Sequence, residues 1–137
     1  MKQLRCNVIA IVTLLCCTAA IAAAAQKVHV VVKVPADTPA DAEVYLAGSL
    51  PAVGEWKAAG VKLERQKDGT YAVDVELEPD QTLEFKFTRG TWETVEKKAD
   101  GSERDNRSVK IQADTKRIDA TVEKWASNGS SASPIEP

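Results

Sequence analysis

The chain has 137 residues, of which 18 are basic and 20 are acidic, so its formal net charge is −2. This near balance argues against a nucleic-acid-binding protein, which uses a clustered basic face. All three cysteines, at positions 6, 16 and 17, lie near the N-terminus, so the rest of the chain is free of disulfides. A chain of this length can bury a hydrophobic core large enough to stabilise its fold without disulfide bonds.

Residues 1–25 have the pattern of an export signal. Two basic residues precede an apolar run over 8–25 that ends in four alanines, which suits cleavage before Gln26. Two alternatives stay open: an uncleaved anchor, since a spanning helix needs about 20 apolar residues, and lipid modification at Cys16 or Cys17. We expect an exported protein, periplasmic or secreted, with no membrane contact after cleavage.

Cleavage would leave 112 residues with a formal charge of −4, because the signal carries two basic residues and no acidic one. In this part, apolar residues alternate with polar ones over short segments bounded by Pro and Gly turns, and no helical stretch is present. The alternation predicts an all-β sandwich over residues 26–125. The Ser/Ala/Pro-rich residues 126–137 are predicted to be disordered. The predicted strands are 27–34, 44–48, 61–65, 71–78, 83–88, 109–111 and 118–123.

The strand with Leu83, Phe85 and Phe87 shows which side chains face the core. These apolar residues recur at every second position, so they share the inward face and Lys86 faces outward. Trp125, at the end of the last predicted strand, is expected in the core. Tyr45 and Tyr71 are expected to pack in the core or at its rim. The charge-rich loop 93–105 is expected to be a solvated surface.

Residue types needed for catalysis are scarce. His29 is the only histidine, and its alternation with valines places it on an exposed strand face without an evident acid or serine partner. The chain contains no nucleophile elbow or phosphate loop. The acidic run at 100–106 lacks the spacing of a helix-loop-helix calcium site. We therefore expect no enzyme activity, no metal and no cofactor.

Two of the three tryptophans, Trp56 and Trp92, lie in polar loops that contain glycine. An exposed indole can stack on the apolar face of a sugar ring, while nearby amide or ammonium groups bond the hydroxyls. Lys86 and Asn106 are candidate hydrogen-bond donors to the sugar hydroxyls. The alternatives are partial core or loop packing of Trp56, packing of Trp92 against its own loop, a solvated Lys86, and an Asn106 whose side chain holds the loop by bonds to the backbone.

Several motifs, taken together, resemble carbohydrate-binding module family 20, the starch-binding domains. Residues 44–49 (VYLAGS) followed by 53–56 (VGEW) resemble the family's "VYLxGS…LGxW" opening. Residues 82–87 (TLEFKF) resemble its "xFEYKF" strand, and 105–107 (DNR) its "PNR" element, with Asp105 where proline is usual. Residues 120–125 (ATVEKW) resemble its closing strand and tryptophan.

The resemblance covers about residues 28–125 and implies an immunoglobulin-like antiparallel β-sandwich. It implies an α-glucan site in which Trp56, Lys86 and Asn106 match family positions. The family's second tryptophan normally lies just before the asparagine, where residues 100–104 carry no aromatic residue, so Trp92 is the candidate for its role. The family's second site depends on tyrosines in a loop that is shortened here to 66–70, and we expect that site to be absent.

Two functions follow as hypotheses. The first is a non-catalytic module for α-glucans such as starch or glycogen, working alone or beside a glucan-active enzyme. The alternative is an exported β-sandwich protein-interaction or scaffold domain that has lost sugar binding. The lack of an aromatic residue at 100–104 and of the second-site tyrosines favours the alternative.

Overall fold

The computed structural model describes residues 24–126. Residues 1–23 of the predicted export signal and residues 127–137 of the predicted disordered tail lie outside this part. Within it, no helix has the length and apolarity that a membrane crossing requires.

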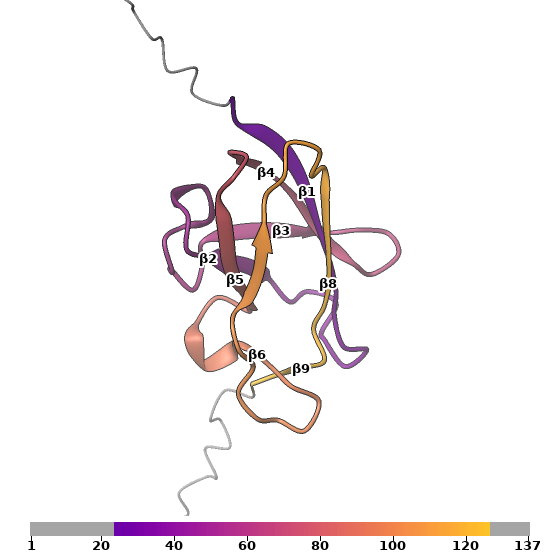
Figure 1. Cartoon of the computed structure of the whole chain (residues 1–137). Coiled ribbons are helices and arrows are strands. Elements are labelled where there is room, and N and C mark those ends of the chain that lie inside the picture. Colours follow the sequence, from indigo (N-terminus) through magenta and orange to yellow (C-terminus); the bar gives the residue numbers. More distant parts are fainter. Residues whose placement is uncertain (1–23, 127–137) are drawn as a thin grey trace, which may run out of the picture.

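Strands account for nearly all the regular structure of residues 24–126, and two single 3-10 turns interrupt the connecting loops (Figure 1). The short alternating segments form strands close to the predicted bounds because alternation suits a pleated layer with one buried face. The strands are β1 (Gln26–Lys33), β2 (Val44–Gly48), β3 (Val61–Arg65), β4 (Tyr71–Leu77), β5 (Thr82–Thr88), β6 (Glu96–Lys97), β7 (Arg107–Lys110), β8 (Arg117–Thr121) and β9 (Lys124–Trp125), with turns η1 (Pro51–Val53) and η2 (Trp92–Thr94).

Seven strands form one sheet in the order β7-β5-β2-β3-β4-β1-β8, and β6 pairs with β9. The sheet folds over at β3, where the first residues of the strand pair with β2 and Glu64 and Arg65 pair with β4. Its two edge strands meet at one end, where the Arg107 guanidinium on β7 donates a hydrogen bond to the carbonyl of Thr121 on β8. The predicted all-β sandwich is confirmed.

One strand pair departs from the predicted antiparallel arrangement. β1 and β8 run parallel, with Val30 opposite Ile118 and Val32 opposite Ala120. β8 follows β7, which lies at the opposite end of the sheet order, so the chain crosses between the two edges before β8 pairs with β1 in the same direction. Alternation within a strand marks its buried face and carries no signal about the direction of its neighbour.

The core lies between the two folded halves of the sheet and contains the residues that alternation placed there. Phe85 and Phe87 meet edge to face with ring centroids 5.6 Å apart, a favourable aromatic geometry. Trp125 is buried as expected, and its indole nitrogen donates to the Thr38 hydroxyl at 2.9 Å. Tyr71 is buried, whereas Tyr45 is half-buried.

The expectation of a solvated loop at 93–105 is wrong for its first part. Thr94, Val95 and Glu96 are buried, and Glu96 is completely so. The two-residue strand β6 holds this stretch against β9, with Glu96 opposite Trp125. Strands of two residues are too short to show a period of two. The sequence therefore does not distinguish the buried β6–β9 pair from a solvated, charged loop.

Candidate functional site

Lys86 and Asn106 lie at the same end of the ladder between β5 and β7, one residue beyond its last pair. Lys86 lies between the buried Phe85 and Phe87, so its side chain faces outward, where it is half-buried. The antiparallel ladder of β5 and β7 ends with Phe85 opposite Arg107. Lys86 follows Phe85 and the exposed Asn106 precedes Arg107, so both residues lie one position beyond the last pair. An ammonium group and an amide therefore lie at the same end of this ladder, although 20 residues separate them in the chain.

The loop that carries Trp56 folds onto this same face. The Trp56 backbone N–H donates to the carbonyl of Gly48, at the end of β2, at 2.7 Å. Glu55 and Trp56 have φ values of 48° and 64°, a left-handed conformation that non-glycine residues adopt only at a cost. Ala47, which pairs with Lys86, is on the outward face yet has no exposed surface. The outer face is therefore covered beside Lys86, and the indole of Trp56 is half-buried.

Thr88 connects the two loops that carry tryptophan. It lies two residues after Lys86 on the same outward face and is completely buried. Its hydroxyl donates to the carbonyl of Ala58, in the Trp56 loop, and accepts the backbone N–H of Gly90, which leads to η2, at 3.1 Å. Both segments lie on the left of Figure 1, with η2 as the salmon coil below. One hydroxyl thus positions both loops relative to Lys86.

Trp92 begins the turn η2 and is the one large apolar side chain that residues 24–126 expose, at 42% of its surface. The turn itself is firmly held: the Thr94 hydroxyl accepts the backbone N–H groups of Arg89 and Thr91 and donates to the carbonyl of Thr91. An indole exposed on an ordered turn is available to a flat ligand without further ordering cost. Trp92 lies in η2, which follows β5, the strand of Lys86. It does not lie in the segment just before Asn106.

The electrostatic setting of Lys86 is partly acidic. Lys97, hydrogen-bonded to Glu103, lowers the pKa of that carboxyl, and the positive charge of Lys86 lowers it further. Lys86 is therefore near the loop that precedes Asn106. Together the four predicted residues offer two flat apolar faces, an ammonium donor and an amide, which are groups that recognise a neutral polyhydroxylated ring. The buried Thr88 and Thr94 were not predicted, because a threonine at a strand end has no distinctive sequence pattern.

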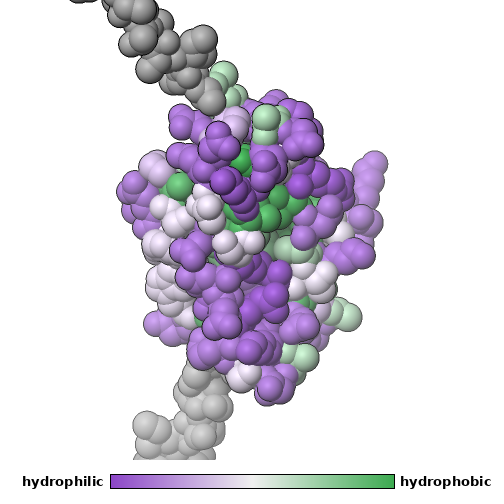
Figure 2. All heavy atoms as spheres, in the orientation of Figure 1, coloured by the Kyte–Doolittle hydropathy of each residue, from purple (hydrophilic) through white to green (hydrophobic). Residues whose placement is uncertain are grey.

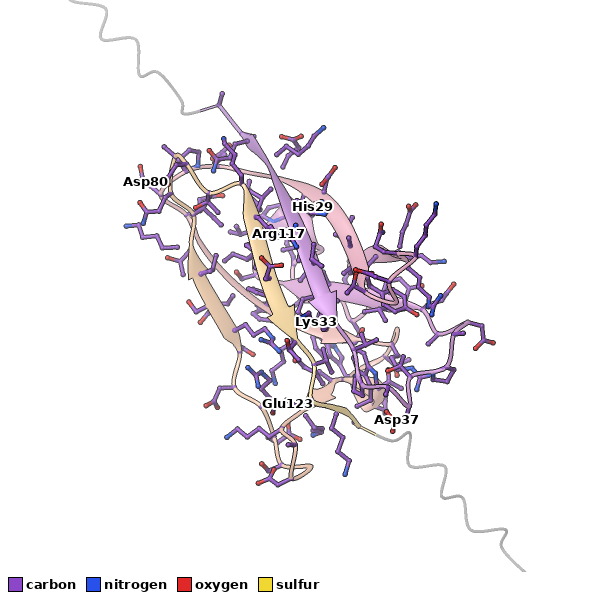
Figure 3. All side chains as sticks on the ribbon, turned by 90° about the vertical axis from the view of Figure 1, so that its right-hand side faces the viewer. His29, Lys33, Asp37, Asp80, Arg117 and Glu123 are labelled. Atoms are coloured by element: carbon purple, nitrogen blue, oxygen red, sulfur yellow. The ribbon has the colours of Figure 1, made fainter. Side chains whose placement is uncertain are left out.

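Other polar clusters do not share these features. His29, expected to lack an acid partner, has Asp74 across the β1–β4 ladder, with Nδ1 and Oδ1 2.6 Å apart, so that expectation is wrong. The pair is about half exposed on both sides. Figure 3 shows His29 and Lys33 on β1, beside Arg117 on β8. A hollow of about 530 Å³ next to β8 is lined by charged residues of both signs and by no aromatic residue.

The face in Figure 2 is mostly hydrophilic, with one small apolar area in its upper half. Over residues 24–126, no group of His, Cys, Asp and Glu side chains is arranged to hold a metal ion. The segments around Lys86 combine two tryptophans with an ammonium group and an amide.

Comparison with known proteins gives one family. The model of the starch binding domain family, CBM 20, matches residues 27–121. An α-amylase of Niallia circulans is 36% identical over 96 residues, which cover 69% of this chain and 7% of the amylase. An amylopullulanase of Thermoanaerobacter thermohydrosulfuricus is 31% identical over 102 residues, covering 72% and 7%. The chain thus spans less than a tenth of the length of these curated relatives.

Solved structures give the same fold. The family 20 carbohydrate-binding module of a maltotetraose-forming amylase from Pseudomonas saccharophila superposes with a TM-score of 0.50 at 19% identity, over 70% of this chain and 99% of that one. The γ-CGTase of Bacillus clarkii gives a TM-score of 0.54 at 22% identity, over 73% of this chain and 15% of that one. At these identities the likeness concerns the fold alone.

Proposed function

Since this chain belongs to the starch-binding domain family, we propose that residues 26–125 bind α-glucan chains of the starch or glycogen type and do not cleave them. The observation that carries the proposal is that Lys86 and Asn106 lie at one end of the β5–β7 ladder, where Thr88 of β5 holds the loops of Trp56 and Trp92. Family membership supports the ligand class, and this geometry supports the place where it binds.

Each side chain has a separate role in the proposed site. The indole of Trp56 stacks on the apolar C–H face of a glucose ring, and Trp92 provides a second surface further along the chain. The Lys86 ammonium donates to ring hydroxyls, and the Asn106 amide both donates and accepts. A strand face presents these groups on a shallow outer surface, which suits a polymer that continues past the site in both directions.

The setting of the module is also a proposal. The N-terminal pattern of residues 1–25 supports export to the periplasm or beyond the cell. The curated relatives are named as an α-amylase and amylopullulanases, which supports a role beside a glucan-active enzyme, either in a longer protein or as a separate partner.

Substitution of the two loop tryptophans tests the proposal. We expect Trp56→Ala to abolish retention on insoluble starch, because truncating an aromatic anchor typically costs about 2 kcal/mol or more, roughly 30-fold in affinity. Trp92→Ala should weaken retention less, since that side chain is already 42% exposed. Arg117→Gln, on the outer face of β8, is the control and should bind as wild type. A Trp56→Ala protein that is retained like wild type would exclude this site.

One observation favours a second candidate function, a protein-interaction domain without sugar contacts. Residues 98–104, which precede Asn106, form an exposed polar turn closed by the Asp100 carboxylate on the Ser102 backbone and hydroxyl. No aromatic residue is present there to complete a two-sided platform. Affinity electrophoresis in amylose, amylopectin and glycogen separates the two functions. Retardation by any of these glucans supports glucan binding. Mobility equal to that in a gel without glucan, in all three cases, supports the second candidate.

A further inference from the structure

The carboxylate of Glu96 is completely buried and has a full set of partners. Its oxygens accept two hydrogen bonds from the Arg107 guanidinium, from Nε at 2.9 Å and from Nη2 at 2.8 Å. They also accept the backbone N–H of Phe87 at 3.2 Å. Arg104 Nε lies 3.7 Å away. A buried carboxylate is unfavourable unless it is paired in this way, so these groups are held in one arrangement.

Both residues that donate hydrogen bonds to Glu96 are next in the chain to a residue of the proposed glucan site. Phe87 follows Lys86, and Arg107 follows Asn106. Glu96 itself lies two residues after η2, the turn that begins with Trp92. One carboxylate therefore joins the three segments that carry Lys86, Asn106 and Trp92.

The Arg107 side chain is fixed on its other sides as well. Nη2 donates to the Thr121 carbonyl on β8, and the guanidinium carbon lies 5.6 Å from the centroid of the Phe87 ring. A guanidinium bound through two parallel N–H groups has a defined orientation, which a single ammonium contact does not provide. The backbone at Arg107, and with it the start of β7, is held against β5.

We infer that Glu96 is the positioning residue of the glucan site. Through Arg107 and the Phe87 N–H, it holds Asn106 at the same end of the β5–β7 ladder as Lys86 and fixes η2 at the end of β5. The inference rests on the proposed function, because its readout is glucan affinity. Glu96 does not contact the glucan, since it has no exposed surface.

The first variant is Glu96→Gln, which keeps the size of the side chain and the acceptor for Phe87 but removes the charge that orients Arg107. Titration calorimetry with maltoheptaose, at a temperature where the variant is fully folded, should show affinity lowered at least tenfold. Acrylamide quenching of tryptophan fluorescence should increase, because η2 is no longer held in place. Val75→Ala, a core variant in β4, is the control for stability and should keep wild-type affinity and quenching.

A double variant separates positioning from stability. Glu96→Leu with Arg107→Met removes both charges, and replacing a buried ion pair by apolar residues is often neutral or stabilising. We expect it to be at least as stable as Glu96→Gln and still at least tenfold weaker for maltoheptaose. If Glu96→Gln does not fold, Arg107→Lys takes its place, since an ammonium keeps the charge but loses the two-point contact.

Three outcomes decide the inference. Folded variants with weakened affinity and increased quenching support it. Folded variants that bind maltoheptaose like wild type overturn it and leave the proposed function standing, since the ion pair then serves stability alone. A wild-type protein that shows no binding overturns both the proposed function and this inference.

Discussion

Thr88 illustrates how single residues control the site without touching a ligand. It is buried on the outward face of β5, and its hydroxyl serves both the Ala58 carbonyl and the Gly90 N–H. Its role was not evident from the sequence, because the Thr88 neighbours come from loops about 30 residues before it and two after it. Lys86 was predicted correctly as an outward residue, but only the ladder between β5 and β7 shows that Lys86 and Asn106 lie at the same end of these two strands.

Thr88→Val removes the hydroxyl while keeping the shape of the side chain. We expect the free energy of unfolding to fall by about 1–3 kcal/mol, because a buried carbonyl and N–H lose their partner. Glucan affinity should fall as well, because both tryptophan loops loosen. Urea denaturation and titration calorimetry measure the two effects. Thr88→Ser, which keeps the hydroxyl, should retain wild-type affinity, and a Thr88→Val protein with undiminished affinity would contradict the argument.

At the scale of elements, the loop between β2 and β3 determines where Trp56 lies. η1 is followed by Gly54, which caps it with a φ of 86°, and the chain passes close to Gly54 again at Gly60. A Cβ atom at Gly54 would lie 2.6 Å from the Gly60 Cα atom. The close approach of the two glycines allows the loop to fold back on β2. The sequence predicted a loop here from its proline and glycines, but not its return path.

Gly54→Ala should therefore open the Trp56 loop. We expect a loss of unfolding free energy on the order of 3 kcal/mol, combining left-handed strain with overpacking, and loss of starch retention. Gly69→Ala is the matched control: its φ is 85°, but its nearest neighbour would be 3.9 Å away. That control should lose only about 1–2 kcal/mol and keep starch binding. Equal losses in the two variants, measured by urea denaturation, would refute the role of the close approach.

For the whole molecule, stability is expected to decrease on the acid side. Several exposed carboxyl groups accept hydrogen bonds from Lys, Arg, Ser or Thr side chains, which lower each pKa from ordinary values of 4.5 for Glu and 3.8 for Asp. A lowered folded-state pKa stabilises the protein above the unfolded pKa, and this stabilisation is lost as pH falls through the folded value. The groups are Glu43, Asp68, Asp100, Glu103 and Asp119.

The free energy of unfolding should be nearly constant from pH 7 to about pH 5 and should fall below about pH 4.5. Each group is exposed, so each contribution is small and only the sum is measurable. Denaturant titrations at pH 7, 5, 4 and 3 give the profile. Asp119→Asn should make the acid limb shallower. Stability that is unchanged or higher at pH 3 would contradict the expectation.

Alternation and turn residues, by themselves, determined the seven strands of the main sheet and their buried faces, because a period of two is a local property of the chain. They placed Lys86 outward and Leu83, Phe85 and Phe87 in the core. Only the tertiary structure decided the parallel pairing of β1 with β8, the burial of Glu96, and the placement of Lys86 and Asn106 at one end of the β5–β7 ladder. These depend on which strands become neighbours after the sheet folds at β3, and contacts between distant segments leave no periodic pattern in the sequence.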